Sequence, residues 1–191
     1  MSNSLLQVEN LKVSFDVSSE GDMPWTKPKK LQAVNNVSFN LSSGETLGIV
    51  GESGCGKSTL ARAIVKMVPT DSGKVLWLGN DLLSLNKSEM RKHRKQIQMI
   101  FQDPLASLNP RMNIGEIIAE PLRTHYPKTP EADVQERVSD VMKKVGLLGN
   151  LVNRFPHEFS GGQCQRIGIA RALILKTKLI ICDDPVSALD V

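Results

Sequence analysis

The amino-acid sequence predicts an α/β fold in a single domain, because its 191 residues hold both strand-type and helix-type patterns. Apolar and polar residues alternate over residues 5–15 and 32–42, which is typical of half-buried strands. A short apolar run at 46–50 predicts another strand, followed by glycines and an apolar-periodic helix at 57–67. An unbroken apolar run at 179–182 is typical of a parallel strand covered on both faces.

Shorter patterns define the other elements of the first half. Residues 16–30 are rich in Ser, Gly, Pro and Lys and predict a loop. Residues 75–78 predict a strand that ends in a turn at 79–81. The strongly basic stretch 87–95 indicates a helix with a solvated face, and 97–101 predicts a short buried strand.

The second half begins with a change of pattern at residues 103–130, which carry five prolines and predict a different substructure. Apolar side chains at helical spacing between 134 and 145 predict an amphipathic helix with its stripe in the core. Thr129 suits its N-cap, Pro130 its first turn and Gly146 its C-terminal end.

Composition limits the class of protein without choosing its partner. Apolar residues at 40% and charged residues at 23% favour a packed core over disorder. The net charge of +4 is compatible with nucleic acid, anionic lipid or nucleotide phosphates. Three widely spaced cysteines indicate neither a disulfide framework nor a zinc site. With no leader-type segment and no long apolar stretch, we expect a cytosolic chain, or one bound to a membrane only through partners.

Residues 51–58 read GESGCGKS and match the phosphate-loop pattern G-x-x-x-x-G-K-[ST] in full. Glycines allow the backbone to wrap closely around phosphate, and the following helix directs its N-terminal amides at the anion. Lys57 can reach the β- and γ-phosphates of a nucleotide, and Ser58 can bind Mg²⁺. Cys55 is expected to be incidental, since the loop acts through its backbone.

Two further features agree with a nucleotide site. Asp183 follows the apolar run 179–182, at the edge of a parallel sheet where ligands bind, and can hold Mg²⁺. Ser160 and Gln163 have the spacing of a capping box, so a helix should start there and run to about 175. The two glycines between them make a second anion-binding helix N-terminus, and an ordinary helix cap remains the alternative.

Together these motifs resemble those of the ABC ATPases. In chain order they are residues 51–58 (Walker A), Gln102 (Q-loop), 160–163 (signature), Asp183 (Walker B) and 187–190 (D-loop). Phe15 stands where this family places an aromatic side chain that stacks on adenine. The amino-acid sequences of residues 101–111 and 159–173 are similar to those of oligopeptide and dipeptide permeases.

The resemblance implies a transport ATPase that binds ATP and Mg²⁺. It implies an ABC-type core with an antiparallel β subdomain and the Walker A core at 1–101, a helical subdomain at 102–158 and the signature helix to D-loop at 159–191. The implied nucleotide-binding residues are Phe15, Gly51, Ser53, Gly54, Cys55, Gly56, Lys57, Ser58, Thr59, Ser160, Gly161, Gly162 and Gln163. The implied Mg²⁺ ligands are Ser58, Gln102 and Asp183, and the implied catalytic residues are Asp184 and Gln102.

The same resemblance implies partners and a location. Two nucleotide-binding subunits would pair head to tail, here as a heterodimer, with each ATP between one Walker A and the other signature. Residues 102–158 would meet membrane permease subunits, which act with an extracytoplasmic peptide-binding protein. No nucleic-acid partner is implied, and the subunit would be peripheral, on the cytoplasmic face of the inner membrane.

Two departures from the family pattern affect this expectation. Asp184 stands where the family has the glutamate that acts as general base, and its side chain is shorter by about 1.5 Å. The family has further core strands and a switch histidine beyond the position of Val191, so we expect an incomplete, C-terminally truncated domain. His93, His125 and His157 lie too early to replace that histidine.

These departures leave three functions open. The leading hypothesis is a peptide-import ATPase. A soluble ABC ATPase of DNA repair or translation is less favoured, because no coiled-coil insertion or tandem domain is evident in the sequence. A non-catalytic nucleotide-binding module is favoured by Asp184 and by the end of the chain.

Overall fold

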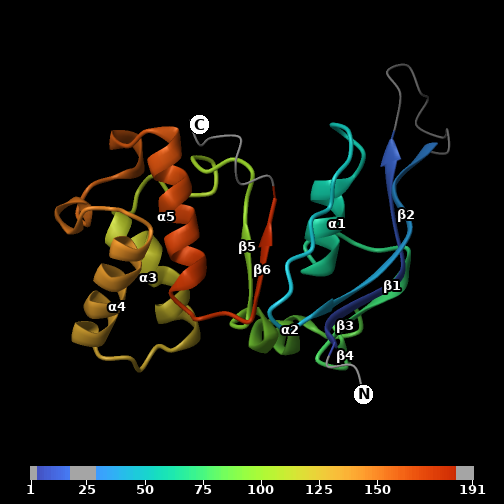
Figure 1. Ribbon diagram of the computed structural model, residues 1–191, viewed down its shortest axis with the longest axis horizontal. Coiled ribbons are helices and arrows are strands. Elements are labelled where there is room, and N and C mark those ends of the chain that lie inside the picture. Colours follow the sequence, from blue (N-terminus) through green and yellow to red (C-terminus); the bar gives the residue numbers. More distant parts are fainter. Residues whose placement is uncertain (1–3, 18–28, 184–191) are drawn as a thin grey trace. The chain divides into compact units, whose positions relative to one another are not determined.

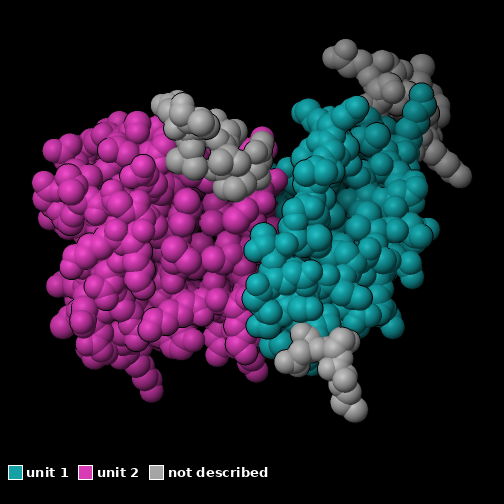
Figure 2. Space-filling view, viewed as in Figure 1, with its two compact units in different colours: residues 1–90 teal, residues 91–191 magenta. Residues whose placement is uncertain are grey.

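The computed structural model describes residues 4–17 and 29–183, which divide into two compact units. The first unit covers residues 1–90 and the second covers residues 91–191 (Figure 2). Helix α2 (Lys87–Arg94) contains the boundary between them. Within the described residues, no helix combines the length and apolar character that crossing a membrane requires.

The first unit is built on an antiparallel sheet with the strand order β2-β1-β3-β4 (Figure 1). Its strands are β1 (Ser4–Val17), β2 (Lys29–Ser42), β3 (Ser72–Trp77) and β4 (Asn80–Asp81). Val8 of β1 pairs with Phe39 of β2 on one side and Val75 of β3 on the other. The predicted strands at 5–15, 32–42 and 75–78 are therefore confirmed, and together they form the expected antiparallel subdomain.

One face of this sheet forms the core of the first unit. Leu6 and Val8, and then Leu11 and Val13 beyond a shift in register, are buried on β1. Helix α1 (Lys57–Ile64) contacts β1 and β2 and buries Leu60, Ala63 and Ile64. The helix predicted at 57–67 is confirmed, although it ends before residue 67.

The strand predicted at 46–50 is wrong in this structure. Residues 45–50 form no ladder, and Val50 is 92% exposed. A strand needs a neighbour to satisfy its N–H and C=O groups, and no described strand pairs with this segment. The apolar run by itself predicted a strand, but this segment does not join the sheet.

The second unit contains a parallel pair of strands, β5 (Ile97–Ile100) and β6 (Leu179–Cys182). Ile100 lies opposite Cys182, so both strands end at the same edge. Helix α5 (Gly161–Leu173) contacts β5. The predicted parallel arrangement is confirmed, but the complete coverage expected of β6 is not. Ile180 and Ile181 are only partly buried, because among the described residues α5 packs against β5 and β6 is an edge strand of a two-stranded sheet.

The helices of the second unit share one apolar core. Helices α3 (Ile114–His125), α4 (Glu131–Lys144) and α5 pack together, with short 3₁₀ turns at Gly149–Leu151 and Pro156–Glu158. The stripe on α4 points into this core, as predicted. The N-cap of α4 is Pro130 rather than Thr129, whose hydroxyl donates to the Tyr126 carbonyl 2.8 Å away. Gly146 follows α4 with a φ of 73°, consistent with the predicted end.

Helix α3 lies in the proline-containing stretch 103–130, where the residue pattern indicated only a different substructure, and within the helical subdomain that the family resemblance implied at 102–158. Its N-terminus is closed by a capping box between Asn113 and Glu116, with both hydrogen bonds 2.9 Å long. Pro121 lies inside the helix and cannot donate to the carbonyl of Ile117. Burial of Ile114, Ile117, Ile118 and Leu122 against α4 and α5 compensates for that lost bond.

Candidate nucleotide-binding site

The phosphate-loop motif runs directly into the N-terminus of α1. Gly56 is the N-cap, with a left-handed φ of 99°, and its carbonyl accepts the first helical hydrogen bond, from Leu60, at 2.9 Å. No side-chain hydrogen bond caps this helix within the described residues. The first amides of a helix have no intrahelical acceptor, and the helix dipole is positive there. This end of α1 is therefore suited to receive an anion.

The Lys57 ammonium is held by the carbonyls of its own loop. Its Nζ donates to the carbonyl oxygens of Gly51 and Glu52, both 2.7 Å away, and lies 3.8 Å from the Cys55 Sγ. The Cys55 amide donates to the same Glu52 carbonyl at 3.3 Å. These contacts keep a positive charge beside the loop amides, where a phosphate group would need it.

Gly56 has a steric role besides its backbone conformation. A Cβ at this position would lie 2.1 Å from the carbonyl oxygen of Ala33, well inside any permitted contact. Ala33 belongs to β2, so the phosphate loop rests against the sheet through backbone atoms on both sides. Sequence reasoning missed Ala33, because an alanine in a strand carries no signal of a backbone contact with a loop 23 positions later.

Phe15 lies on the strand pair that supports this loop. It is 36% exposed and pairs with Leu31, two residues before Ala33 on β2. A partly exposed ring at this place offers a flat apolar surface in the same unit as the phosphate loop.

Gln102 and Asp183 meet at the carboxyl edge of the parallel strands. Asp183 directly follows β6, and its amide donates to the Ile100 carbonyl at 2.9 Å, extending the β5–β6 ladder. Gln102 follows β5 by two residues and is exposed, whereas Asp183 is only 4% exposed. Parallel topology thus brings together an amide and a carboxylate that are 81 positions apart in the sequence.

The signature motif forms the N-terminus of α5. Ser160 is the N-cap, its Oγ accepts from the Gln163 amide at 3.3 Å, and its own amide donates to the Gln163 Oε1 at 3.0 Å. The predicted capping box is therefore confirmed. Gly161 and Gly162 occupy the first turn, and the space where a Cβ would project from Gly161 is open. Little side-chain bulk covers the amides of this turn.

The predicted site residues thus form a group in each unit. Phe15 and residues 51–59 belong to the first unit, and Gln102, residues 160–163 and Asp183 to the second. Asp184 and the D-loop at 187–190 lie outside the described residues.

Comparison with known proteins identifies the family. The sequence profile described as "ABC transporter" matches residues 34–187. The chain is 66% identical to the oligopeptide transport ATP-binding protein OppF of Salmonella typhimurium and 64% identical to OppF of Escherichia coli, over 98% of its length in both cases. It is 49% identical to the oligopeptide transport ATP-binding protein AppF of Bacillus subtilis, also over 98% of its length. It spans 56% of the length of each of these relatives.

Solved structures agree with this match. The ATP-binding cassette MJ0796, in a dimeric post-hydrolysis state bound to ADP and Pi, superposes with a TM-score of 0.86 at 28% identity. That comparison covers 97% of this chain and 76% of MJ0796. CbiO1 of Clostridium perfringens, part of the cbiONQ transporter complex, gives a TM-score of 0.76 at 26% identity, over 99% of this chain and 68% of its own. The chain belongs to the ABC transporter family and has its ATP-binding cassette fold.

We expect Gly56→Ala to destabilise the protein strongly. The new Cβ would meet the Ala33 carbonyl oxygen, and alanine in the left-handed region by itself costs about 1–2 kcal/mol. Gly44→Ala is the matched control, since Gly44 has a φ of 78° but open space around a Cβ. The free energy of unfolding, measured by denaturant titration, should fall clearly further for Gly56→Ala. Equal losses in the two variants would show that the contact with Ala33 does not constrain the loop.

Proposed function

We propose that this chain is the ATP-binding subunit of an ABC importer, which couples MgATP binding and hydrolysis to oligopeptide or dipeptide uptake. The observation that carries the proposal is the phosphate loop, with its uncapped helix end and the Lys57 ammonium held beside it. The names of the relatives, which include oligopeptide and dipeptide transport ATP-binding proteins, support the choice of substrate.

In this proposal the nucleotide is bound mainly through its phosphates. The amides of residues 51–59 surround the phosphates, Lys57 supplies a positive charge, and Phe15 stacks on adenine. The first-turn amides of α1 and the open backbone of the glycines favour a bound polyanion. Exposure of the Phe15 ring on β1 is consistent with a role in stacking.

Mg²⁺ suits the polar residues that the motifs supply. Ser58, Gln102 and Asp183 offer hydroxyl, amide and carboxylate oxygens, which are the donors that this cation prefers. The fit is supported by the position of Asp183, a buried carboxylate at the same sheet edge as Gln102. When bound, Mg²⁺ would offset the negative charge of the nucleotide phosphates.

Hydrolysis requires a base that accepts a proton from the attacking water. We assign this role to Asp184, the residue after the Mg²⁺ ligand, and we assign Gln102 to sensing the γ-phosphate. The shorter side chain of Asp184 can act through an additional water, so slow turnover is expected rather than none.

The proposed assembly is a head-to-tail pair of ATP-binding subunits, here a heterodimer. The second anion-binding helix end, at Ser160, supports this, because a single nucleotide needs only one phosphate loop. The dimeric state of MJ0796 is consistent with such a pair. Integral membrane permease subunits would contact residues 102–158, with an extracytoplasmic peptide-binding protein delivering substrate. The subunit would then be peripheral, on the cytoplasmic face of the inner membrane.

Lys57→Ala should raise the Kd for MgATP by one to two orders of magnitude, because a charge-assisted hydrogen bond contributes about 1.5–3 kcal/mol. Calorimetric titration of the purified full-length protein measures this. Lys66→Ala is the matched control. The Lys66 ammonium also binds two carbonyls, those of Leu83 and Leu85, but lies outside the phosphate loop. Unchanged affinity in Lys57→Ala, or equal losses in the two variants, would contradict the phosphate-loop assignment.

Ser160→Arg should leave MgATP binding by the separate subunit intact and should block formation of the ATP-bound pair. An arginine at this helix end fills the space above the glycine turn and removes the serine cap. Size-exclusion chromatography with light scattering, in ATP and with the partner subunit, measures pairing. Ser88→Arg adds the same side chain on exposed α2 and should pair normally. If Ser160→Arg lowered subunit affinity as much as Lys57→Ala, the head-to-tail site would be wrong.

Asp184→Glu should raise ATP turnover in the full-length protein at saturating ATP. The added methylene moves the carboxylate about 1.5 Å outward, and general-base catalysis contributes about 10²–10⁴-fold, which bounds the gain. Asp183→Glu makes the same chemical change one residue earlier and should not raise turnover. If Asp184→Glu is no faster than the natural residue, Asp184 is not the general base, and the non-catalytic alternative gains support.

A further inference from the structure

Arg171 makes a long-range contact that the motifs do not account for. It lies near the C-terminal end of α5, and its Nη1 donates to the carbonyl oxygen of Ser107, 2.7 Å away and 64 positions earlier. Burial lowers the pKa of the Arg171 guanidinium, and the nearby Glu120 carboxylate opposes that effect. A partly buried arginine is costly unless its donors are satisfied, and the Ser107 carbonyl provides such an acceptor.

The loop that Arg171 holds begins directly after Gln102. Asp103 organises it, since its Oδ1 accepts from the Ala106 amide at 2.9 Å and its carbonyl from the Ser107 amide at 3.2 Å. The Ser107 hydroxyl donates to the Pro104 carbonyl at 2.8 Å. Leu108, only 4% exposed, ends the loop in the helical core. The segment is thus a compact turn, joined to β5 at one end and to the core at the other.

The helix that holds this loop is the one that begins with the signature motif. Ser160 and Arg171 are separated by about three helical turns, or roughly 16 Å of helix rise. Cys164, Ile167 and Ala170 lie between them and are buried in the core, so α5 is packed along its length. If α5 moves as a rigid helix, the Arg171 guanidinium moves with its N-terminus, and so does the contact with the Ser107 carbonyl.

We propose that Arg171 is a positioning residue that couples the signature helix to the loop carrying Gln102. Through the Ser107 carbonyl, it makes the turn at 103–108 move with α5, so that the placement of Gln102 depends on the position of the signature motif. The consequence for ATP hydrolysis rests on the function proposed above. The mechanical coupling itself rests only on contacts within the second unit.

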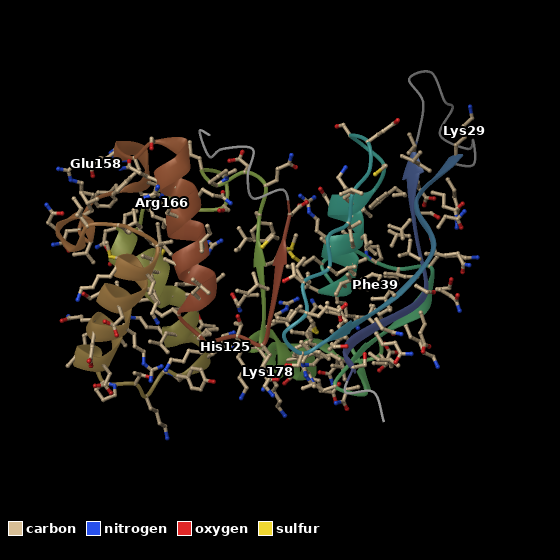
Figure 3. All side chains as sticks on the ribbon, in the orientation of Figure 1. Lys29, Phe39, His125, Glu158, Arg166 and Lys178 are labelled. Atoms are coloured by element: carbon tan, nitrogen blue, oxygen red, sulfur yellow. The ribbon has the colours of Figure 1, made fainter. Side chains whose placement is uncertain are left out.

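The chain supplies a matched control on the same helix. Arg166 also projects from α5, and its Nη1 donates to a backbone carbonyl, that of Gly146, at 3.4 Å (Figure 3). This contact joins α5 to the end of α4 and does not involve the loop after Gln102. Arg166→Met and Arg171→Met therefore each remove one arginine–carbonyl contact from α5, and only the second releases the turn.

The first measurement is amide hydrogen exchange of the full-length protein, which does not depend on ATPase activity. Arg171→Met should increase exchange in residues 103–108 about tenfold, and Arg166→Met should leave it unchanged. Arg171→Lys keeps a charged donor and should restore most of the protection. Unchanged exchange in Arg171→Met would overturn the proposal, whether or not the protein hydrolyses ATP. If Arg171→Met does not fold, Arg171→Gln decides, because its shorter, uncharged side chain does not reach the Ser107 carbonyl. Exchange in residues 103–108 equal to that of the natural protein would then overturn the proposal.

The second measurement separates positioning from general stability. Arg171→Met should lower kcat for ATP about tenfold and leave KM within about twofold, because the phosphate loop is intact. In a double-mutant cycle, Arg171→Met should add little to the loss caused by Gln102→Ala, since both act through the same side chain. The coupling role would be overturned if the kcat losses of Arg171→Met and Gln102→Ala multiply in the double variant. It would also be overturned if Arg166→Met lowers kcat as much as Arg171→Met does. Absent turnover in the natural protein would instead refute the proposed function and leave hydrogen exchange to decide the coupling.

Discussion

The first backbone amides of a helix need hydrogen-bond acceptors from outside the helix. The candidate site of this protein depends on how the helix N-termini meet that need. At α3 the capping box of Asn113 and Glu116 satisfies it, and the end is purely structural. At α5 the box formed by Ser160 and Gln163 satisfies part of it and leaves a glycine turn open. At α1 the N-cap is Gly56, whose side chain can accept nothing. Of these three ends, α1 is the least capped, and it carries the phosphate-loop sequence. Helix α4 also lacks a side-chain cap, but Glu131 and Asp133 in its first turn disfavour an anion there.

Close backbone packing holds the α1 end in place. The loop approaches β2 so closely at Ala33 that only glycine fits at position 56, and the carbonyls of Gly51 and Glu52 hold the Lys57 ammonium. These contacts use main-chain atoms almost entirely. A side chain added at position 56 would therefore disturb the loop, because its Cβ would meet the Ala33 carbonyl oxygen.

In the second unit, parallel strand pairing and a partly buried arginine hold the candidate site residues in place. The β5–β6 ladder brings Gln102 and Asp183 to one edge, and Arg171 ties the turn that follows Gln102 to the signature helix. The chain belongs to the ABC transporter family, and the motifs named above lie at the N-termini of α1 and α5 and after the ends of β5 and β6. In the proposed function, Asp184 is the residue expected to limit the rate of ATP hydrolysis.

The sequence by itself determined the local structure: the phosphate loop and its helix, the capping box at Ser160 and the apolar stripe of α4. These signals lie within a few residues of one another, so spacing is enough to detect them. Tertiary structure alone decided that residues 46–50 join no sheet, that α3 forms despite Pro121, and that Arg171 binds the Ser107 carbonyl. The reason is that each of these outcomes depends on partners distant in sequence, whether a neighbouring strand, a covering core or a backbone carbonyl, and local residue patterns do not specify such partners.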